Sequence, residues 1–464
     1  MQPAGKSVLE STGMVSRRLP KGRVAVQALG CKVNQYEAEA VAGMFERRGY
    51  SVVPFESCAD VYLVNTCTVT ASADRKSRQL IHRASRANPG ALVIVMGCYS
   101  ELAPGEVAAM PGVRLVLGTR GRSDVVDLVD EVVRNDTTLV KAGVGRAWEK
   151  RPVFEDIPGR WLRDSRCRAM LKIQDGCGQR CSYCAIPHAR GPSRSRVLDS
   201  IVLEAKRLAE AGCRELVLTG VHLGSYGRDL RPQVHLAEVL AAVCEVDGVW
   251  RVRLSSIEPT EIDAPVIDAV KQLPEACKHF HIPLQSGDDS ILEAMNRPYR
   301  VRDFQDAAER LRAALPEAAV TTDVMVGFPG ESTRQFQNTL EVVRRVGFTR
   351  LHVFKYSPRR GTPAAGMGGE VEERLKAARS RELVALGREL SLSYHRGFLG
   401  RSLQVMIERE RGRDVWEGLS GTYVRVRASA GVSPCMIGET VEVEIESVSH
   451  DGAEGHIVGC SGRP

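Results

Sequence analysis

Three cysteines share one short loop of the chain, and their thiolates could bind a metal. They have the spacing Cys-x-x-x-Cys-x-x-Cys, at Cys177, Cys181 and Cys184. Soft thiolate ligands select zinc or iron–sulfur clusters over hard cations. Three ligands are one fewer than a closed zinc site needs, and His188 is the local candidate for a fourth. The loop therefore predicts a thiolate metal centre short of one ligand, with a zinc or redox-thiol loop as the alternative.

Three further cysteines, Cys31, Cys67 and Cys98, each stand just beyond a predicted strand. These strands are expected at 23–29, 60–65 and 91–96. They alternate with helical patterns, which predicts a parallel sheet whose strand ends share one ligand-binding edge. We therefore expect the three thiols to converge at that edge. The alternative is three buried small hydrophobic side chains, a common environment for free cysteine.

Six more strand–helix units follow in the middle of the chain. Their strands are expected at 168–174, 215–218, 251–254, 279–284, 320–326 and 351–355. Six units are fewer than the eight of a closed barrel, so we expect an open, partial (β/α)6 barrel with its site at the strand carboxyl ends. The polar or glycine positions expected near this mouth are Thr219, Gly220, Glu258, Gln285 and Asp323. Polar residues inside a barrel also occur as packing solutions.

The fold class is therefore α/β, with a small antiparallel β-barrel predicted at the carboxy terminus. Alternating strands separated by glycine favour that last barrel. The predicted divisions are a disordered lead-in at 1–22, an α/β domain at 23–140, a linker at 141–165, the partial barrel at 166–395 and the β-barrel at 396–464.

Composition places the chain among globular proteins. Of its 464 residues, 43% are hydrophobic and 26% are charged. No apolar run approaches the roughly 20 residues that span a bilayer, and the first residues lack a signal-peptide core, so we expect no membrane partner and a cytoplasmic location. Thirteen cysteines in such a protein indicate metal or redox chemistry before disulfides.

Short motifs from both cysteine regions resemble those of the radical S-adenosylmethionine methylthiotransferases. The motifs lie at 28–37, 65–70, 97–98, 177–184, 284–287 and 326–331, and the final barrel is similar to that family's RNA-binding TRAM domain. Within the family, the stretches at 30–36 and 219–227 look like the branch that acts on N6-threonylcarbamoyladenosine at tRNA position 37. The product of that branch is the 2-methylthio derivative.

This resemblance implies two 4Fe-4S clusters. Cys177, Cys181 and Cys184 would hold the one whose open iron binds S-adenosylmethionine (SAM) and generates a 5′-deoxyadenosyl radical. The second set, Cys31, Cys67 and Cys98, would hold the cluster that carries the sulfur. Such chemistry suits the unactivated C2–H bond of adenine, which side-chain bases do not deprotonate usefully near neutral pH. An electron donor and a sulfur source are then required partners.

We expect SAM to be bound near Thr219, Gly220, Glu258, Gln285 and Asp323. Two alternatives keep the fold and the cofactors: methylthiolation of isopentenyladenosine in tRNA, and of an aspartate in a ribosomal protein. A third alternative is a non-catalytic iron–sulfur protein that binds RNA. The open fourth position in both cysteine sets favours a catalytic protein.

The net charge of +7 permits an anionic partner, and the resemblance implies the tRNA anticodon stem-loop. The last domain contains only 8 basic against 10 acidic residues, so its affinity for RNA would have to come from a local face. We expect phosphate contacts from two basic groups near the cysteines. They are Arg75, Lys76 and Arg78, after Cys67, and Arg190, Arg194 and Arg196, after Cys184. The alternative for the first group is a solvated charged helix face.

Overall fold

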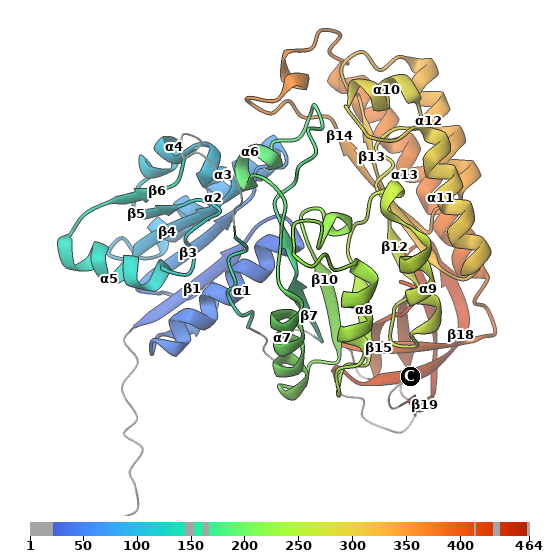
Figure 1. Cartoon of the computed structure of the whole chain (residues 1–464), viewed down its shortest axis with the longest axis horizontal. Helices are drawn as coiled ribbons and strands as arrows, with labels where there is room; N and C mark the ends of the chain where they lie inside the picture. Colours follow the sequence, from blue (N-terminus) through green and yellow to red (C-terminus); the bar gives the residue numbers. More distant parts are fainter. Residues whose placement is uncertain (1–21, 144–152, 161–166, 413, 430–436, 462–464) are drawn as a thin grey trace, which may run out of the picture.

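The structure is a computed structural model that describes residues 22–143, 153–160, 167–412, 414–429 and 437–461 (Figure 1). Most of the predicted lead-in, and the predicted linker at 144–152 and 161–165, lie outside the described residues. In Figure 1 an N-terminal sheet, blue to cyan, stands beside a central barrel, green to orange, and a C-terminal barrel in red packs below the latter. The candidate site is formed where the first two units face each other.

The N-terminal sheet has six parallel strands in the order β2-β1-β3-β4-β5-β6. The strands are β1 (Arg23–Ala28), β2 (Ser51–Val53), β3 (Val61–Thr66), β4 (Leu92–Gly97), β5 (Val113–Leu117) and β6 (Leu139–Lys141). The predicted parallel α/β domain is confirmed. From β1 the chain moves first to one side and then to the other, so β1 and β3 border a topological switch point, the place where such sheets bind ligands.

Helices cover both faces of this sheet. They are α1 (Lys32–Arg47), α2 (Ala71–Ala87), α3 (Cys98–Leu102), α4 (Pro104–Ala108) and α5 (Val125–Asn135). On one face Phe45 of α1 packs in a core with Leu63, while on the other Ile81 of α2 packs with Val64. Neighbouring residues of β3 therefore serve opposite cores, as expected for a strand buried on both sides.

The central domain is the predicted open barrel of six parallel strands. They are β7 (Arg168–Lys172), β10 (Glu215–Thr219), β11 (Arg251–Leu254), β12 (His279–His281), β13 (Ala319–Val326) and β14 (Arg350–Lys355). Two three-stranded sheets, β11-β10-β7 and β12-β13-β14, are joined by isolated parallel bridges such as Ser256 to His281. A single hydrophobic core runs behind all of these strands.

Helices cover the outside of the central barrel. They are α7 (Leu198–Glu210), α8 (Leu236–Cys244), α9 (Ala264–Gln272), α10 (Asp289–Ala294), α11 (Val301–Ala314), α12 (Thr333–Val346) and α13 (Glu373–Arg396). Beside the cysteine loop lie the short strands β8 (Gln174–Asp175) and β9 (Arg194–Ser195) and the helix α6 (Ile186–Arg190). No helix in the described part of the chain has the length and apolar character that crossing a membrane requires.

The C-terminal unit is a closed five-stranded barrel in the order β15-β16-β17-β19-β18. Its strands are β15 (Ser402–Gly412), β16 (Val415–Ser420), β17 (Arg425–Ser429), β18 (Thr440–Ser449) and β19 (Gly452–Ser461). Val405, Val426 and Val443 contribute to its core. The predicted small β-barrel is confirmed, although β17 and β19 pair in parallel and the other neighbours are antiparallel.

The C-terminal barrel closes the amino end of the central barrel. Arg251 donates to the carbonyl of Leu419 at 2.8 Å, and Arg253 donates to that of Ser420 at 3.1 Å. Tyr423, whose φ of 65° lies in the left-handed region, stacks on His279 with ring centroids 4.0 Å apart. This closed floor leaves the strand carboxyl ends as the face that meets the N-terminal domain.

Candidate functional site

The loops that carry Cys31, Cys67 and Cys98 are interlocked at the edge of the N-terminal sheet. Cys31 precedes α1, Cys67 follows β3 and Cys98 begins α3. A Cβ atom added to Gly30 would lie 2.5 Å from Cys67 Sγ, and one added to Gly97 would lie 2.4 Å from the carbonyl oxygen of Thr66. The glycine before each of two cysteines therefore lets its loop approach the third.

The Asn34 side chain ties the first two of these loops together. Its Nδ2 donates to the carbonyl of Leu29 at 2.8 Å and to the carbonyl of Thr66 at 2.9 Å. Asn65 Nδ2 in turn donates to the Asn34 carbonyl at 2.7 Å. These amide groups hold the backbone just before Cys31 and Cys67 in one arrangement.

The three thiols are close enough for the charge of one to raise the pKa of another. Burial raises the pKa of the Cys98 thiol to about 12, and charge on Cys31 or Cys67 would raise it further, whereas the Arg190 guanidinium lowers it. Burial likewise raises the pKa of Cys67, and Cys31 adds to that effect. Thiolates at this edge therefore need a compensating positive group, which a bound metal centre supplies.

The loop with Cys177, Cys181 and Cys184 is fixed by its neighbours in the central barrel. Cys177 N–H donates to the Gly191 carbonyl at 2.9 Å, and Cys184 N–H donates to the Cys181 carbonyl at 3.0 Å. Asn296 Nδ2 donates to the Arg180 carbonyl at 2.7 Å. The residue that follows α6 and the segment that follows α10 thus hold the loop at Cys177 and Arg180.

Two cations contact this second set of thiols. Arg297 Nη1 lies 3.1 Å from Cys181 Sγ, and its other nitrogen is paired with Glu258. His222 Nδ1 lies 3.7 Å from Cys177 Sγ, while its Nε2 lies 2.9 Å from Glu261. Burial opposes the charged form of His222, but its contacts with Cys177 and Glu261 raise its pKa to about 10. Both cations favour thiolate over thiol.

A cavity of about 150 Å³ lies between the two domains beside Cys184. Val69 and Thr70, which follow Cys67, line it from the N-terminal domain, and Gln285 and Asp323 line it from the central barrel. We call it the interdomain cavity. Segments adjoining both cysteine sets therefore meet one space.

The structure separates the five residues predicted to contact SAM. Gln285 and Asp323 line the interdomain cavity, and the φ of 62° at Gln285 places it in the left-handed region. Glu258 lies near the loop through its ion pair with Arg297. Thr219 is buried with its hydroxyl 4.0 Å from the sulfur of Met170, and Gly220 packs against the side chain of Gln174.

Comparison with known proteins identifies the family. Residues 171–343 match the radical SAM superfamily, and residues 23–118 match "Uncharacterized protein family UPF0004". The chain is 40% identical to threonylcarbamoyladenosine tRNA methylthiotransferase MtaB of Bacillus subtilis, over 94% of this chain and 96% of that protein. It is 37% identical to MtaB of Thermotoga maritima, over 94% and 96%. The chain belongs to the radical SAM methylthiotransferase family.

Other relatives are more distant. The chain is 32% identical to the tRNA-2-methylthio-N(6)-dimethylallyladenosine synthase of Pelotomaculum thermopropionicum, over 92% of this chain and 95% of that protein. Among solved structures, the radical S-adenosylmethionine methyltransferase TsrM of Kitasatospora setae aligns with a TM-score of 0.56 and 16% identity, over 74% of each chain. At that identity the likeness concerns the fold alone.

The cysteine arrangement of this methylthiotransferase suits iron–sulfur clusters better than single metal ions. Within the described ranges, no three His, Cys, Asp or Glu side chains are grouped so as to hold a single metal ion. A 4Fe-4S cluster makes a different demand, because each cysteine binds its own iron and the thiols surround the cluster. Three neighbouring thiols on interlocked loops meet that demand. His188, the local candidate for a fourth ligand, is exposed and lines a separate cavity with Arg359 and Tyr99.

The residues predicted to contact RNA fall into a more exposed group and a buried group. Arg75 and Lys76 are exposed on α2, and Arg78 is half-buried with Tyr99 and Glu106. Arg194 and Arg196 are only 3% exposed. Their guanidinium groups pair with Asp175 and Glu204. These two arginines are therefore structural cations in this conformation, because buried charges require partners and theirs are carboxylates rather than phosphates.

Sequence reasoning missed several residues of the site. Arg297 and Lys355 reach the cysteine loop or the interdomain cavity, yet no spacing relates them to a cysteine. Glu37 was also missed, although it lies within six residues of Cys31. Arg190 was expected, together with Arg194 and Arg196, to contact RNA, whereas the structure pairs it with Glu37 across the two domains.

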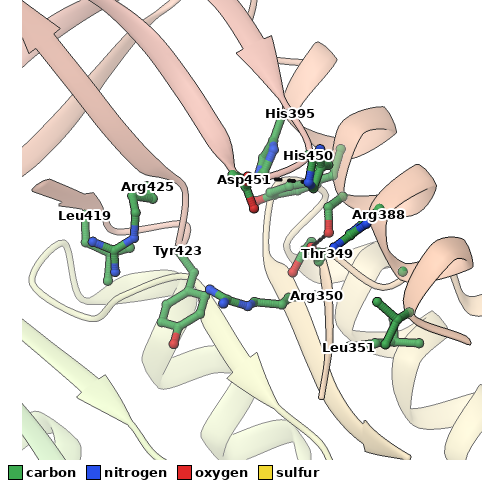
Figure 2. A pocket seen from close by; sticks show the side chains of 14 residues that line it. Thr349, Arg350, Leu351, Arg388, His395, Leu419, Tyr423, Arg425, His450 and Asp451 are labelled. Atoms are coloured by element: carbon green, nitrogen blue, oxygen red, sulfur yellow. Dashed lines mark hydrogen bonds and ion pairs between the residues drawn. The ribbon is translucent and has the colours of Figure 1, made fainter. Parts of the chain in front are cut away.

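A further cavity, of about 180 Å³, lies far along the chain from the cysteines (Figure 2). It is bounded by the start of β14, by α13 and by loops of the C-terminal barrel. Arg350, Arg388 and Arg425 line it, and Figure 2 shows Arg350 directed toward Tyr423. Its cationic lining is of the kind that can contact an anion.

Proposed function

We propose that this chain adds a methylthio group to C2 of N6-threonylcarbamoyladenosine at position 37 of tRNA. The observation that carries the proposal is the interdomain cavity, where segments next to Cys67 and Cys184 line one space together. A base placed there would lie between the two cysteine sets. The substrate assignment is supported by the named function of the relatives at 40% and 37% identity.

We further propose that each cysteine set holds a 4Fe-4S cluster. Cys31, Cys67 and Cys98 would hold one, and Cys177, Cys181 and Cys184 the other. When bound, the clusters and SAM supply one-electron cleavage of SAM and a sulfur for transfer, chemistry that amino-acid side chains lack. An electron donor and a sulfur source would serve these clusters, and the cytoplasm is the proposed location.

The chain's own residues would bind and orient the reactants. Gln285 and Asp323 present polar groups to the interdomain cavity on the side of Cys184, and are the proposed SAM contacts there. The Asp323 carboxylate is also 3.4 Å from Nε2 of His281. Glu258 would act through Arg297, holding that guanidinium against Cys181. Thr219 and Gly220 would shape the floor of the SAM site by packing.

RNA would be held by exposed cations around the mouth and by the C-terminal barrel, for which a TRAM-like role is proposed. Arg75 and Lys76 are exposed on the helix that follows the Cys67 loop. The cavity in Figure 2 adds Arg350 and Arg388 at the junction with the C-terminal barrel. Phosphate contacts of this kind give affinity and register without reading sequence.

Dimethylallyladenosine in tRNA is the second candidate substrate, favoured by relatives at 32% identity that are named for it. Nucleoside analysis distinguishes the two. Deletion of the gene should remove 2-methylthio-N6-threonylcarbamoyladenosine from total tRNA and leave the dimethylallyl derivative and the ribosomal proteins unchanged. Loss of a different methylthio product would reassign the substrate.

Cysteine variants test the two-cluster proposal in the purified protein. The reconstituted parent should contain about eight irons, and each triple Cys→Ala variant about four. Both variants should lose the methylthio product, and only the variant of Cys177, Cys181 and Cys184 should lose SAM cleavage. Retention of about eight irons in either variant would refute the ligand assignment.

A further inference from the structure

Seven charged residues are packed between the N-terminal domain and the central barrel, and we call them the interdomain ion cluster. They are Glu37, Arg122, Glu155, Lys172, Asp175, Arg190 and Arg194. Apart from Glu155, each side chain is no more than 3% exposed. Buried charges of this density are costly unless each is paired and hydrogen-bonded. The pairs therefore fix the docking of the two domains closely.

Arg190, like Lys172 and Arg122, pairs with carboxylates of both domains. Arg190 differs from them in also reaching Asn34. Its Nη1 donates to Glu37 Oε1 and to Asp175 Oδ1, each at 2.8 Å. Its Nη2 donates to Asn34 Oδ1 at 2.7 Å and to Glu37 Oε2 at 3.0 Å. Asn34 and Glu37 belong to α1 in the N-terminal domain, and Asp175 belongs to β8 of the central domain. A planar guanidinium makes such contacts in fixed directions.

The contacts with Asn34 and Asp175 each lead to a cysteine loop within one or two residues. Asn34 holds the carbonyls of Leu29 and Thr66, just ahead of Cys31 and Cys67. Asp175 Oδ1 also accepts from Gly176 N–H at 2.8 Å, immediately before Cys177. The Arg190 guanidinium is thus linked to the loops of both cysteine sets, in each case through two successive hydrogen bonds.

The helix that carries Arg190 reaches the remaining cysteines. α6 begins two residues after Cys184 and packs against α3, whose first residue is Cys98 (Figure 1). Thr119 Oγ1 donates to the Ala189 carbonyl at 2.6 Å and fastens α6 to the N-terminal domain. The Arg190 charge accordingly acts on Cys98, and each favours the charged form of the other.

The interdomain ion cluster contains four cations and three carboxylates. The cations are Arg122, Lys172, Arg190 and Arg194, and the carboxylates are Glu37, Glu155 and Asp175. The Arg190 guanidinium also favours the charged form of Cys98. A thiolate there would be a further anionic partner for Arg190.

We infer that Arg190 is a positioning residue that holds the two cysteine sets at a fixed separation across the interdomain cavity. This inference rests on the proposed function. Removing the bridge would leave both sets intact but let them shift relative to each other, so that radical formation and sulfur transfer no longer meet at one base. A misplacement of about 1 Å is worth about 100-fold in rate.

The decisive comparison uses Arg190→Met and Arg190→Lys, with Arg379→Lys as the matched control. Arg379 is likewise a buried arginine, and it donates to the buried carboxylate of Glu331 at 2.6 Å. Arg379 lies in α13 and Glu331 just before α12, both in the central domain, so this control should behave as the parent. Arg190→Met should keep about eight irons, and should cleave SAM within about threefold of the parent, while methylthio product falls about 100-fold. Arg190→Lys should recover part of that loss, since lysine restores the charge without the fork.

A second measurement does not depend on turnover. In a background lacking Cys177, Cys181 and Cys184, the remaining N-terminal cluster can be titrated alone. Arg190→Met should shift its midpoint potential to a more negative value, because a nearby positive charge that stabilises the reduced state is removed. Arg190→Lys should shift it less, and Arg379→Lys should leave it near the parent value.

The inference would be overturned if Arg190→Met kept both the parent ratio of methylthio product to SAM cleaved and the parent midpoint potential. If Arg190→Met loses its clusters, Arg190→Lys decides alone. A parent-like ratio of product to SAM cleaved in that variant would also overturn the inference. A parent enzyme that makes no methylthio product on threonylcarbamoyladenosine tRNA would instead refute the proposed function. The potential measurement would still report whether Arg190 acts on the N-terminal cysteine set.

Discussion

At the scale of single residues, the N-terminal cysteine set depends on a glycine, whose lack of a side chain leaves room for a neighbouring loop. Gly97 precedes Cys98 with a φ of 105°, which a residue with a Cβ rarely adopts. A Cβ there would also lie 2.4 Å from both Asn65 Oδ1 and the Thr66 carbonyl. Because both neighbours belong to the chain leading into Cys67, any adjustment would move that cysteine.

Gly97→Ala should therefore cost about 2–3 kcal/mol of stability through backbone strain alone, with the clash added to it. The iron bound by the N-terminal set should fall selectively, leaving about four irons per chain. Gly105→Ala is the matched control, because it lies in α4 with nothing within 4 Å of the added Cβ. It should be neutral or stabilising by up to about 1 kcal/mol. Equal iron content in the two variants would contradict the expectation.

At the scale of elements, the floor of the central barrel shows how strands attach the C-terminal barrel. Glu215 of β10 is fully buried and pairs with Arg251 at 3.3 Å and Arg253 at 3.0 Å. Those arginines donate in turn to carbonyls that follow β16 or end it. Glu215 therefore supports the domain junction without touching the C-terminal barrel.

Acid should loosen this junction. Burial by itself would raise the pKa of Glu215, but Arg251, Arg253 and Arg168 lower it from 4.5 to about 2. A carboxylate whose pKa is depressed in the folded state stabilises above its unfolded pKa and loses that contribution as pH falls through the folded value. The shift corresponds to about 3 kcal/mol, present above pH 4.5 and lost between pH 4.5 and 2.

Unfolding of the parent and Glu215→Gln between pH 2 and 6 measures this contribution. The parent should be more stable by about 3 kcal/mol or more near pH 6, and the difference should shrink toward pH 2. Glu317→Gln is the control, because Glu317 and Arg401 join the same two domains by a pair whose side chains are both 50% exposed. Its effect should stay below about 1 kcal/mol. A pH-independent difference for Glu215→Gln would contradict the assignment.

The elements that follow local periodicity were predictable from sequence, and those that depend on docking were not. β3 and β13 each have a long apolar pattern, and their positions agree with expectation within about two residues. The apolar pattern predicts a helix from Glu37, whereas α1 begins at Lys32 and has Asn34 in its first turn. That polar side chain is buried to bind two loop carbonyls, so it concealed the apolar face.

The site residues were likewise predictable where local pattern and topology place them, and not where contacts between elements do. Strand ends marked Cys31, Cys67 and Cys98, because topology brings parallel strand ends to one edge. The basic run after Cys184 pointed instead to RNA, whereas the structure pairs Arg194 with Asp175 and Arg196 with Glu204. Sequence shows the sign of these side chains but not the carboxylates that strand β8 and helix α7 of the same domain bring to them.

At the scale of the whole molecule, the exposed cations lie unevenly around the mouth of the barrel. Arg75 and Lys76 are exposed on α2, near the loop that lines the interdomain cavity. Arg302 and Arg310 are exposed on α11, which covers the outer wall of the central barrel (Figure 1). The two pairs carry equal charge in different places. Comparing variants of the two pairs therefore distinguishes a local RNA contact from an effect of net charge on RNA binding.

Arg75→Glu with Lys76→Glu should weaken tRNA binding and reduce the slope of log affinity against log salt by about 2. Arg302→Glu with Arg310→Glu changes net charge equally and should leave that slope near the parent value. Filter binding or anisotropy over a range of salt concentrations measures both. Identical slopes for the two double variants would show that α2 is a solvated face and not an RNA contact.

The floor that Tyr423 and Arg253 close has a kinetic consequence. With that end covered by the C-terminal barrel, the mouth between the two domains is the side that we expect the cofactor and the RNA to share. An RNA seated over the mouth would shut the cofactor in beneath it. We therefore predict an order of entry: SAM binds first, tRNA second, and the spent cofactor leaves after the tRNA departs. Product-inhibition patterns would display that order, with the tRNA acting as the lid of its own reaction.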